Sequence, residues 1–388
     1  MARAPKPRRL EAALADPMGS FLPALWYHGL RDRLRGRAAR ARARWGRVRA
    51  PAARGRVVWL VAGATRESVG LGVALVQAIR LRRLDIRLVL TFETEFPDLL
   101  AGLAESPKTG WGYGACDHPL AVSRMLARLS PLGVIFVRRC PRPHLARAVG
   151  QVPHVLVIDA EGPEGPLRAE RIYPSNASQG ASWRGATQAP AADLATLLIP
   201  AQVEPNFKSL INGASSRHLW WLHGDDGGRM GALLQAVRSH FPDDVFFLSG
   251  RASEAFAHSL LPLSRWERAA VPGGALVAVD VLQWLPALAA SATGAHFERP
   301  EPSFLWVALA GGCAVSCADI DRLPKPALSE AVSWLAGPDE LIGTWSRYRA
   351  DPIFARGRGD AARRVFWEER RLAGEINEEL LERIFAWS

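Results

Sequence analysis

Two kinds of segment alternate along most of this chain. Short continuous apolar runs, the first of them at 57–62, are followed by longer stretches with apolar residues at helical spacing, such as 69–82. Short apolar runs bounded by turn residues are typical of strands buried on both faces, and such strands joined by helices form parallel sheets. In the first half, strands are expected at 57–62, 86–91, 133–137 and 154–158, and helices at 69–82, 98–105 and 120–129.

The alternation starts again in the second half. Between the two series lies a region, 163–188, rich in Gly, Pro, Ser, Asn and Ala, where long loops are expected, and a linker is expected between 191 and 217. The second series predicts strands at 219–222, 245–248, 275–279 and 314–316, and helices at 230–239, 255–261, 282–291, 304–310, 328–336 and 360–385.

The length of 388 residues points to more than one core, since a domain averages roughly 150 residues. We therefore expect an α/β protein with two Rossmann-like domains facing each other across a cleft, the architecture of the B-type (GT-B) glycosyltransferases. The expected parts are a basic segment at 1–56, an N-terminal domain at 57–203, and a C-terminal domain at 204–388 that ends in a helix.

Composition is that of a soluble globular protein, with 48% hydrophobic and 22% charged residues. No apolar run reaches the roughly 18 residues that a membrane-spanning helix needs. The cysteines lack the second pair or the histidine partners of a zinc site, so reduced thiols and no metal are expected. The four cysteines of the chain are Cys116, Cys140, Cys313 and Cys317.

The formal charge of +11 is concentrated in 31–56, where arginines crowd around a single acid, Asp32. Clustered arginine attracts lipid head groups and nucleic acid by the same electrostatics, or arginine simply serves as a good helix former here. The chain has no zinc-finger spacing, RNA-binding sheet signature or zipper, so no nucleic-acid partner is expected. The neighbouring segment 21–27 is apolar and aromatic, which favours contact with an anionic membrane surface.

A carboxylate, Glu67, follows the first expected strand at the start of the expected helix. Strand ends of open α/β sheets face the ligand crevice, and the next helix supplies N–H groups there. Glu67 is therefore a candidate for chemistry. The alternative interpretation is that it stabilises the helix N-terminus, where an acidic side chain is favourable.

The residues around Glu67 also carry a family resemblance. The segment Trp59-Leu60-Val61-Ala62-Gly63-Ala64-Thr65-Arg66-Glu67 is similar to the Trp-Ile-His-Ala-x-Ser-x-Gly-Glu motif of the 3-deoxy-D-manno-octulosonic acid (Kdo) transferases of lipopolysaccharide synthesis. Trp59, Ala62 and Glu67 match, whereas Val61, Ala64 and Arg66 differ. In that family the glutamate is the proposed catalytic base, so the resemblance implies the same role for Glu67.

The resemblance extends over most of the chain, through residues such as Thr91, Thr94, Tyr113, Asp117, Pro119, Pro131 and Pro143. In the family's acceptor region, Arg138 and Cys140 stand at two acidic positions. The donor-binding residues that the resemblance implies are Arg251, Glu254, Asp280 and Gly294, with Arg251 at the departing phosphate. A surface arginine on a loop is the alternative for Arg251. Residues 304–307 are apolar where the family has Asn and Glu, which removes hydrogen bonds worth about 1–3 kcal/mol each.

The resemblance implies a glycosyltransferase without a cofactor, whose donor is CMP-Kdo or a related nucleotide sugar. It also implies an anionic, lipid A-type glycolipid acceptor and a peripheral position on the cytoplasmic face of the bacterial inner membrane. The alternative is a catalytically inactive or repurposed paralogue that acts as a membrane-associated binding or scaffold protein.

Overall fold

The computed structural model describes residues 22–387 except for 53, 104–106, 163–166, 184–185, 201–216, 225–226, 252, 254–255, 257–259, 263–272, 280–281, 320–322, 324 and 336. The chain divides into two compact units. Unit 1 comprises Met1–Leu194 together with Glu375–Ser388, and unit 2 comprises Ala195–Gly374.

Unit 1 is built on a six-stranded parallel sheet in the order β3-β2-β1-β4-β5-β6. This is the strand order of a dinucleotide-binding Rossmann domain. The strands are β1 (Val57–Ala62), β2 (Arg87–Phe92), β3 (Thr109–Tyr113), β4 (Pro131–Val137), β5 (His154–Ile158) and β6 (Arg171–Tyr173). The apolar runs of β1 and β4 are buried almost throughout, as expected for central strands covered on both faces.

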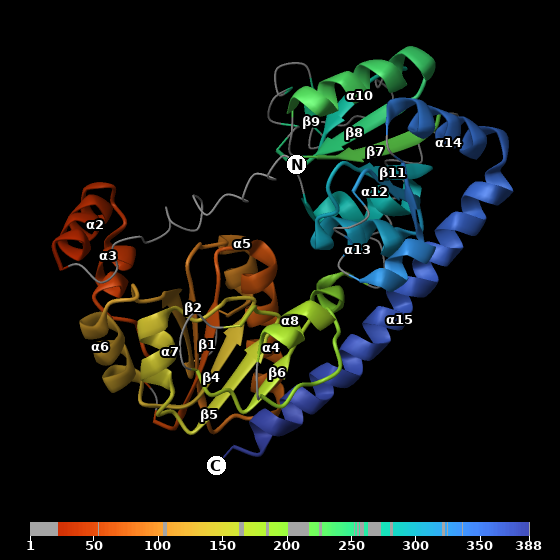
Figure 1. Cartoon of the computed structure of the whole chain (residues 1–388). Helices are drawn as coiled ribbons and strands as arrows, with labels where there is room; N and C mark the ends of the chain where they lie inside the picture. The colour runs from red at the N-terminus through yellow and green to blue at the C-terminus, as the bar shows by residue number, and fades with distance from the viewer. Residues whose placement is uncertain are drawn as a thin grey trace, which may run out of the picture. The chain divides into compact units, whose positions relative to one another are not determined.

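Helices cover both faces of this sheet (Figure 1). The helices of unit 1 are α2 (Leu22–Leu34), α3 (Ala38–Arg44), α4 (Arg66–Arg82), α5 (Pro97–Leu100), α6 (Pro119–Leu129), α7 (Pro143–Val149) and α8 (Ala177–Ser182), with a 3₁₀ turn, η1 (Ala101–Leu103). Helices α6 and α7 pack in one apolar cluster with alternate residues of β1, including Trp59. Helix α4 lies on the other face, where Gly72 lets it approach Leu90 of β2.

The arginine-rich segment folds as a helical hairpin, α2 and α3, that packs on unit 1. Leu25 and Trp45 join an apolar cluster with Cys116 and Ala121. The Cys116 Sγ donates to the Arg44 carbonyl oxygen across 2.9 Å. The hairpin is therefore an integral part of unit 1 rather than a separate segment.

Unit 2 carries a seven-stranded parallel sheet in the order β13-β12-β11-β7-β8-β10-β9. Its strands are β7 (Leu219–His223), β8 (Val245–Ser249), β9 (Leu261–Pro262), β10 (Leu276–Ala278), β11 (Gly294–Phe297), β12 (Ala314–Cys317) and β13 (Val332–Trp334). Its helices are α10 (Gly227–His240), α12 (Leu285–Ser291), α13 (Pro302–Gly311), α14 (Pro338–Ala350) and α15 (Pro352–Phe385), with 3₁₀ turns η2 (Leu194–Leu198), η4 (Leu282–Trp284) and η6 (Pro326–Glu330).

Two apolar clusters lie on opposite faces of this second sheet. Helices α12, α13 and part of α15 belong to one cluster, and α10 and α14 belong to the other. The adjacent tryptophans of β7 point to opposite faces, so Trp221 joins the first cluster and Trp220 the second. Trp220 stacks on Trp345 of α14 with ring centroids 4.2 Å apart.

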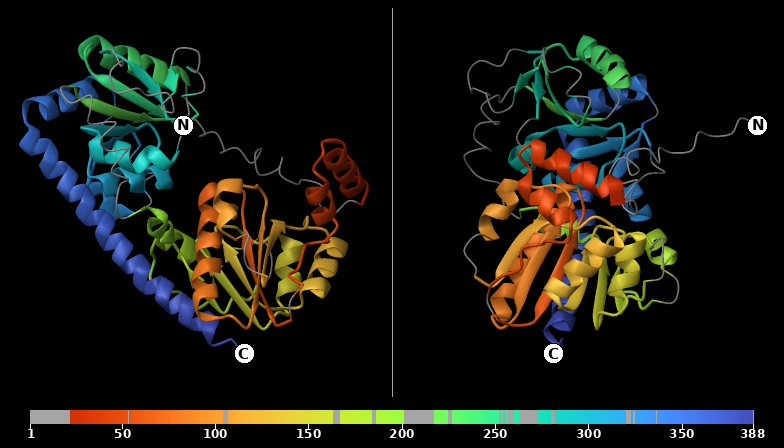
Figure 2. Two further views of the ribbon diagram at one scale, coloured as in Figure 1. Left: turned by 180° about the vertical axis from the view of Figure 1, so that it is seen from behind. Right: turned by 90° about the vertical axis from the view of Figure 1, so that its left-hand side faces the viewer.

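The end of α15 belongs to unit 1, although its first part belongs to unit 2. Its last turns lie beside the end of α4 (Figure 2), where Arg83 donates to the carbonyl oxygen of Phe385 across 2.7 Å. Trp387 lies against Gly133 of β4, and a methyl group at that glycine would be 2.3 Å from the indole ring. The predicted division placed 375–388 in the second domain, and the predicted boundary at 203/204 lies outside the described residues.

Most expected elements are confirmed with shifts of a few residues at their ends. The helix expected at 328–336 is wrong, because this stretch forms η6 and then β13, whose Val332 pairs with Val315. The expected long loops at 163–188 contain β6 and α8. The helix expected at 255–261 lies mostly outside the described residues. In the described part of the chain, no helix has the length and hydropathy to cross a membrane.

Candidate functional site

Each sheet has one position where the strand order reverses and the following helices pass to opposite faces. In unit 1 this topological switch point lies between β1 and β4, and in unit 2 it lies between β7 and β11. Ligands of open α/β sheets bind outside the carboxyl ends of the strands at this position. The residues that follow β1 and β4, and β7 and β11, are therefore the first candidates for a site.

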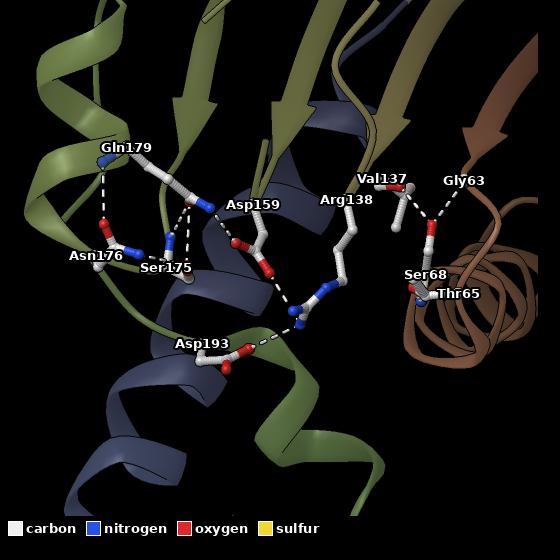
Figure 3. Close-up of polar contacts among 10 residues, drawn as sticks. All are labelled: Gly63, Thr65, Ser68, Val137, Arg138, Asp159, Ser175, Asn176, Gln179 and Asp193. Atoms are coloured by element: carbon white, nitrogen blue, oxygen red, sulfur yellow. Dashed lines mark hydrogen bonds and ion pairs between the residues drawn. The ribbon is translucent and has the colours of Figure 1, made fainter. Parts of the chain in front are cut away.

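In unit 1 the first turn of α4 is fixed to both strands of the switch point. The Ser68 hydroxyl donates to the Val137 carbonyl oxygen of β4 across 2.6 Å and accepts from the Gly63 N–H after β1 across 2.7 Å (Figure 3). Thr65 caps the helix by accepting from the Ser68 N–H. Glu67 is held half-buried between these two residues. The structure thus places Glu67 at the carboxyl edge of the sheet.

An ion cluster follows the carboxyl ends of β4 and β5. The Arg138 Nη1 lies 2.9 Å from the Asp159 Oδ2 and 3.3 Å from the Asp193 Oδ1 (Figure 3). Gln179 donates to the Asp159 Oδ1 across 2.8 Å and accepts from the N–H and the hydroxyl of Ser175. Side chains from four loops therefore converge at this edge.

The charges in this cluster shift one another's pKa. Burial lowers the pKa of Arg138, but the charges of Asp159, Asp193 and Glu67 outweigh it, and the net pKa lies above the usual value. The charge of Glu67, in the first turn of α4, thus contributes to the raised pKa of Arg138. Burial, reinforced by Asp193, raises the pKa of Asp159 despite the nearby Arg138. One buried cation is thus shared by several carboxylates.

The residues that follow β4 and β5 have an unfavourable backbone conformation. Arg138 and Asp159 have φ angles of 48° and 47°, in the left-handed region that costs non-glycine residues about 1–3 kcal/mol. Their backbone N–H groups still donate to the next strand, Arg138 to Ile158 and Asp159 to Tyr173. Such strained residues are concentrated at binding and catalytic sites, where the surrounding structure holds them.

Four more charged side chains follow the carboxyl ends of β2, β3 and β4. The Arg139 Nη2 is 2.8 Å from the Glu93 Oε1, and the Arg142 Nη2 is 3.5 Å from the same oxygen. Asp117 accepts from the N–H groups of His144 and Leu145 at the start of α7. Glu93 therefore faces two arginines.

In unit 2 the switch point is marked by His223, the last residue of β7. Its side chain is buried, with Nδ1 2.9 Å from the Ser249 Oγ and Nε2 3.4 Å from the Glu301 Oε2. The Trp221 Nε1–H donates to the same Ser249 oxygen, so the hydroxyl hydrogen is available to His223 Nδ1. This network assigns the imidazole proton to Nε2, facing Glu301.

The chain of contacts from Ser249 through His223 to Glu301 resembles the catalytic triad of a hydrolase. However, Ser249 does not meet the requirements of a nucleophile. It is 2% exposed, and its oxygen accepts from the Trp221 indole. A nucleophilic hydroxyl must reach the substrate and be activated by its base. Ser249 therefore positions His223 and does not react.

Acidic side chains precede α13, at the other side of this switch point. The Glu301 backbone caps the helix, and the hydrogen bond from His223 is the main cause of the lowered pKa of Glu301, with a smaller contribution from the charge of Arg251. Glu298 follows β11 and pairs with Arg229 across 3.2 Å. The N-terminus of α13, ten residues long, adds a partial positive charge here.

The structure places the four predicted donor-binding residues in different positions. Arg251 is exposed after β8, next to Gly250 with φ 83°, and its charge acts on Glu301. Gly294 begins β11 at the amino end of the strand, buried against Trp220. This is the edge opposite to the one where ligands of such sheets bind, and a contact of Gly294 with the donor stays a prediction. Glu254 and Asp280 lie outside the described residues.

Sequence reasoning missed His223, Glu301, Asp159 and Asp193 as site residues. Asp159 and His223 carry a usable signal, since each is the polar residue at the end of a buried apolar run. Glu301 and Asp193 carry none, because their roles depend on contacts with distant loops. Among the described residues, no group of three or more His, Cys, Asp and Glu is arranged to hold a metal ion.

Solved structures with the same fold include epimerases and glycosyltransferases. A UDP-GlcNAc 2-epimerase from Neisseria meningitidis, bound to UDP-GlcNAc, is 10% identical with a TM-score of 0.56, covering 84% of this chain and 100% of its own. A glycosyltransferase from Rickettsia africae is 11% identical with a TM-score of 0.57, covering 87% and 100%. A UGT transferase from Siraitia grosvenorii, in complex with UDP, is 8% identical with a TM-score of 0.51, covering 85% and 99%.

No protein-family model and no curated protein matches the chain by sequence. At these identities the structural likeness shows the fold alone. The chain has the GT-B fold that was expected, with one Rossmann-like sheet in each unit.

Proposed function

We propose that this chain is a glycosyltransferase that moves Kdo or a related acidic sugar from a CMP-activated donor to an anionic, lipid A-type acceptor. We place the enzyme at the cytoplasmic face of a bacterial inner membrane. The observation that carries the proposal is the position of Glu67, which lies in the first turn of α4 at the switch point of unit 1, where its charge contributes to the raised pKa of Arg138. The identity of the sugar and of the acceptor rests on the resemblance of the segment around Glu67 to the Kdo transferase motif.

In the proposed reaction, Glu67 accepts the proton of an acceptor hydroxyl. The hydroxyl oxygen then bonds to the anomeric carbon of the sugar, while the bond from that carbon to the nucleotide phosphate breaks and the nucleotide leaves with both electrons. A general base of this kind contributes about 10²–10⁴-fold to the rate. Ser68 and Thr65 position Glu67 by fixing the turn that carries it.

The donor nucleotide is assigned to unit 2. Arg251 supplies a cation for the departing phosphate, and the α13 N-terminus adds N–H groups nearby. Several solved structures of this fold are described as complexes with UDP or UDP-sugars. UDP is therefore the nucleotide to compare with CMP.

The deciding experiment combines CMP-Kdo with a tetra-acylated lipid A precursor and compares the wild type with Glu67→Gln. Product from the wild type and a loss of at least about 100-fold in the variant is expected. Thermal shifts with CMP and UDP identify the nucleotide independently. The absence of both turnover and a CMP shift would overturn the donor assignment, and a UDP shift alone would replace CMP by UDP.

The second candidate is an inactive, membrane-associated scaffold, and a specific observation favours it. At both switch points polar side chains already have partners within the chain, since Arg138 pairs with two aspartates and His223 contacts Ser249 and Glu301. Phe304 further covers His223, with ring centroids 4.3 Å apart. Membrane binding without turnover or nucleotide shift would support this candidate.

A further inference from the structure

A basic pocket lies between the α2–α3 hairpin and the carboxyl ends of β2 and β3. Its volume is about 220 Å³. Glu93 is the only carboxylate among the described residues that line it. The basic residues that line this basic pocket are His28, Arg31, Arg40, Arg44, Arg139 and Arg142.

Part of this charge is neutralised and part is not. Arg44 pairs with the buried Asp32 across 2.6 Å, and Arg139 and Arg142 share Glu93. Arg31 and Arg40 pair with no carboxylate in the described part of the chain. The Arg31 Nε is buried without a hydrogen-bond partner there, and the Arg40 guanidinium lies over the Tyr113 ring at 5.6 Å. The pocket thus carries a cation excess around a small cavity.

The size and chemistry of the basic pocket fit a phosphate group. Drug-sized ligands occupy about 300–1,000 Å³, so this cavity suits a head group better than a whole nucleotide sugar. Arginine forks bind phosphate oxygens with charge-assisted, often bidentate hydrogen bonds. A dianionic phosphomonoester would compensate the two arginines that have no carboxylate partner in the described chain.

The other face of the same hairpin is apolar and exposed. Trp26, Tyr27 and Leu30 are 63%, 62% and 57% exposed, far more than large apolar side chains on an inward face. Trp26, Leu30 and Trp45 line a second groove of about 480 Å³, which is also lined by Arg33, Arg42, Arg47 and Arg124. Exposed aromatic residues flanked by arginine are typical of helices that lie at a membrane interface.

We propose that the basic pocket binds the phosphomonoester head group of an anionic lipid whose acyl part contacts the apolar face of the α2–α3 hairpin. The inference deepens the proposed function, since a phosphorylated glycolipid acceptor is such a lipid, and it rests on that function only for the identity of the lipid. Binding itself needs neither donor nor turnover.

The test compares two double variants of the full chain that each remove two positive charges from the hairpin. Arg31→Gln with Arg40→Gln changes the basic pocket, whereas Arg35→Gln with Arg37→Gln changes exposed arginines outside it. Both leave the Arg44–Asp32 and Arg139–Glu93 pairs in place. Circular dichroism and melting temperature establish that both fold. Binding is measured by flotation on phosphatidylcholine vesicles containing phosphatidic acid, or phosphatidylglycerol at the same mole fraction.

The pocket variant is expected to bind phosphatidic acid vesicles about tenfold more weakly than the matched variant, because it loses hydrogen bonds to a charged group as well as charge. Both should bind phosphatidylglycerol, a phosphodiester, equally. Equal losses on phosphatidic acid would overturn the pocket and leave only general electrostatic attraction.

Two further arms identify the source of the phosphate. A melting shift with glycerol 3-phosphate that the pocket variant alone loses, without a difference on vesicles, would overturn the lipid and assign a soluble phosphate. A larger pocket-specific loss on duplex DNA would likewise overturn it. Pocket-specific lipid binding without sugar transfer leaves this inference standing and removes the proposed function alone.

Discussion

Arg138 and Asp159 form an ion pair, 2.9 Å from Nη1 to Oδ2, between two residues that both have a left-handed backbone. They follow adjacent parallel strands, β4 and β5, so the same kink is repeated at neighbouring strand ends. The kinks keep both backbone N–H groups bonded to the next strand while the side chains meet. Asp193 adds a second carboxylate, 3.3 Å away, from a residue 55 positions along the chain.

Replacing Arg138 by glutamine should destabilise unit 1 by about 3 kcal/mol or more, because Asp159 and Asp193 would remain buried without their cation. Asp159→Asn should cost less, about 1–2 kcal/mol, since Asp193 still pairs with Arg138. Hydrogen exchange of β1, β4 and β5 measures both effects within unit 1. Equal losses in the two variants would contradict a shared cation.

The pH dependence of the same cluster has a definite sign. The pKa of Asp159 is raised above its ordinary value of 3.8, so the folded state binds its proton more readily than the unfolded state. Its contribution to the free energy of unfolding therefore decreases as the pH rises from 3.8 through the folded pKa and is constant above it. Asp159→Asn should remove this decrease, as measured by urea titrations at several pH values. A slope unchanged by the substitution would contradict it.

Ser68→Ala should weaken both stability and transfer. It leaves the Gly63 N–H and the Val137 carbonyl without their buried partner, which costs about 1–3 kcal/mol, and it frees the turn that positions Glu67. Under the proposed function, kcat should fall with little change in KM. Thr65→Ala is the control, because it costs about 1 kcal/mol of helix capping while the Ser68 bridge remains. A larger fall in kcat for Thr65→Ala would contradict the role of Ser68.

The sheets could be predicted because their central strands are continuous apolar runs. Strand β1 was predicted to the residue, and β4 and β7 within two residues of their ends. Strand β3 could not be predicted because two of its five residues are glycine. Strand β13 could not be predicted because its three residues follow a turn whose sequence pattern favours a helix. Both segments become strands because they pair with a neighbouring strand, and this long-range pairing cannot be recognised from the local sequence.

The site was predictable only where a local pattern carries it. Glu67 follows an apolar run and begins a helix, so its place at the sheet edge could be predicted. Arg138 was noted only as a departure from a motif, and its partners come from loops 21 and 55 positions later. Gly294 was predicted from a short motif match, which cannot tell the two ends of a strand apart, and it lies at the amino end of β11.

Trp387→Ala should destabilise unit 1 by about 3–5 kcal/mol, because the indole is buried against Gly133 and stacks on His154 with centroids 5.0 Å apart. Trp367→Ala, within α15 and 46% exposed, is the control and should cost far less. The urea midpoint measures both. Similar midpoints for the two variants would mean that the end of α15 does not support unit 1.

His296 should make unit 2 sensitive to acid. Burial lowers the pKa of its imidazole to about 4, from an ordinary value of 6.5, where its Nδ1 lies 3.1 Å from the Ser316 hydroxyl. The unfolded chain therefore binds a proton that the folded state refuses. Stability from this group is complete above pH 6.5 and is lost as the pH falls from 6.5 toward 4, by about 2 kcal/mol at pH 5.

His296→Gln should remove this dependence, since glutamine does not titrate in this range and keeps polar atoms for Ser316. The variant should lose about 2 kcal/mol less than the wild type between pH 7.5 and 5. His240→Gln, an exposed histidine at the end of α10, should follow the wild type. Thermal unfolding of all three proteins at both pH values measures the effect. If His296→Gln loses as much stability as the wild type, the acid sensitivity of unit 2 arises from groups other than His296.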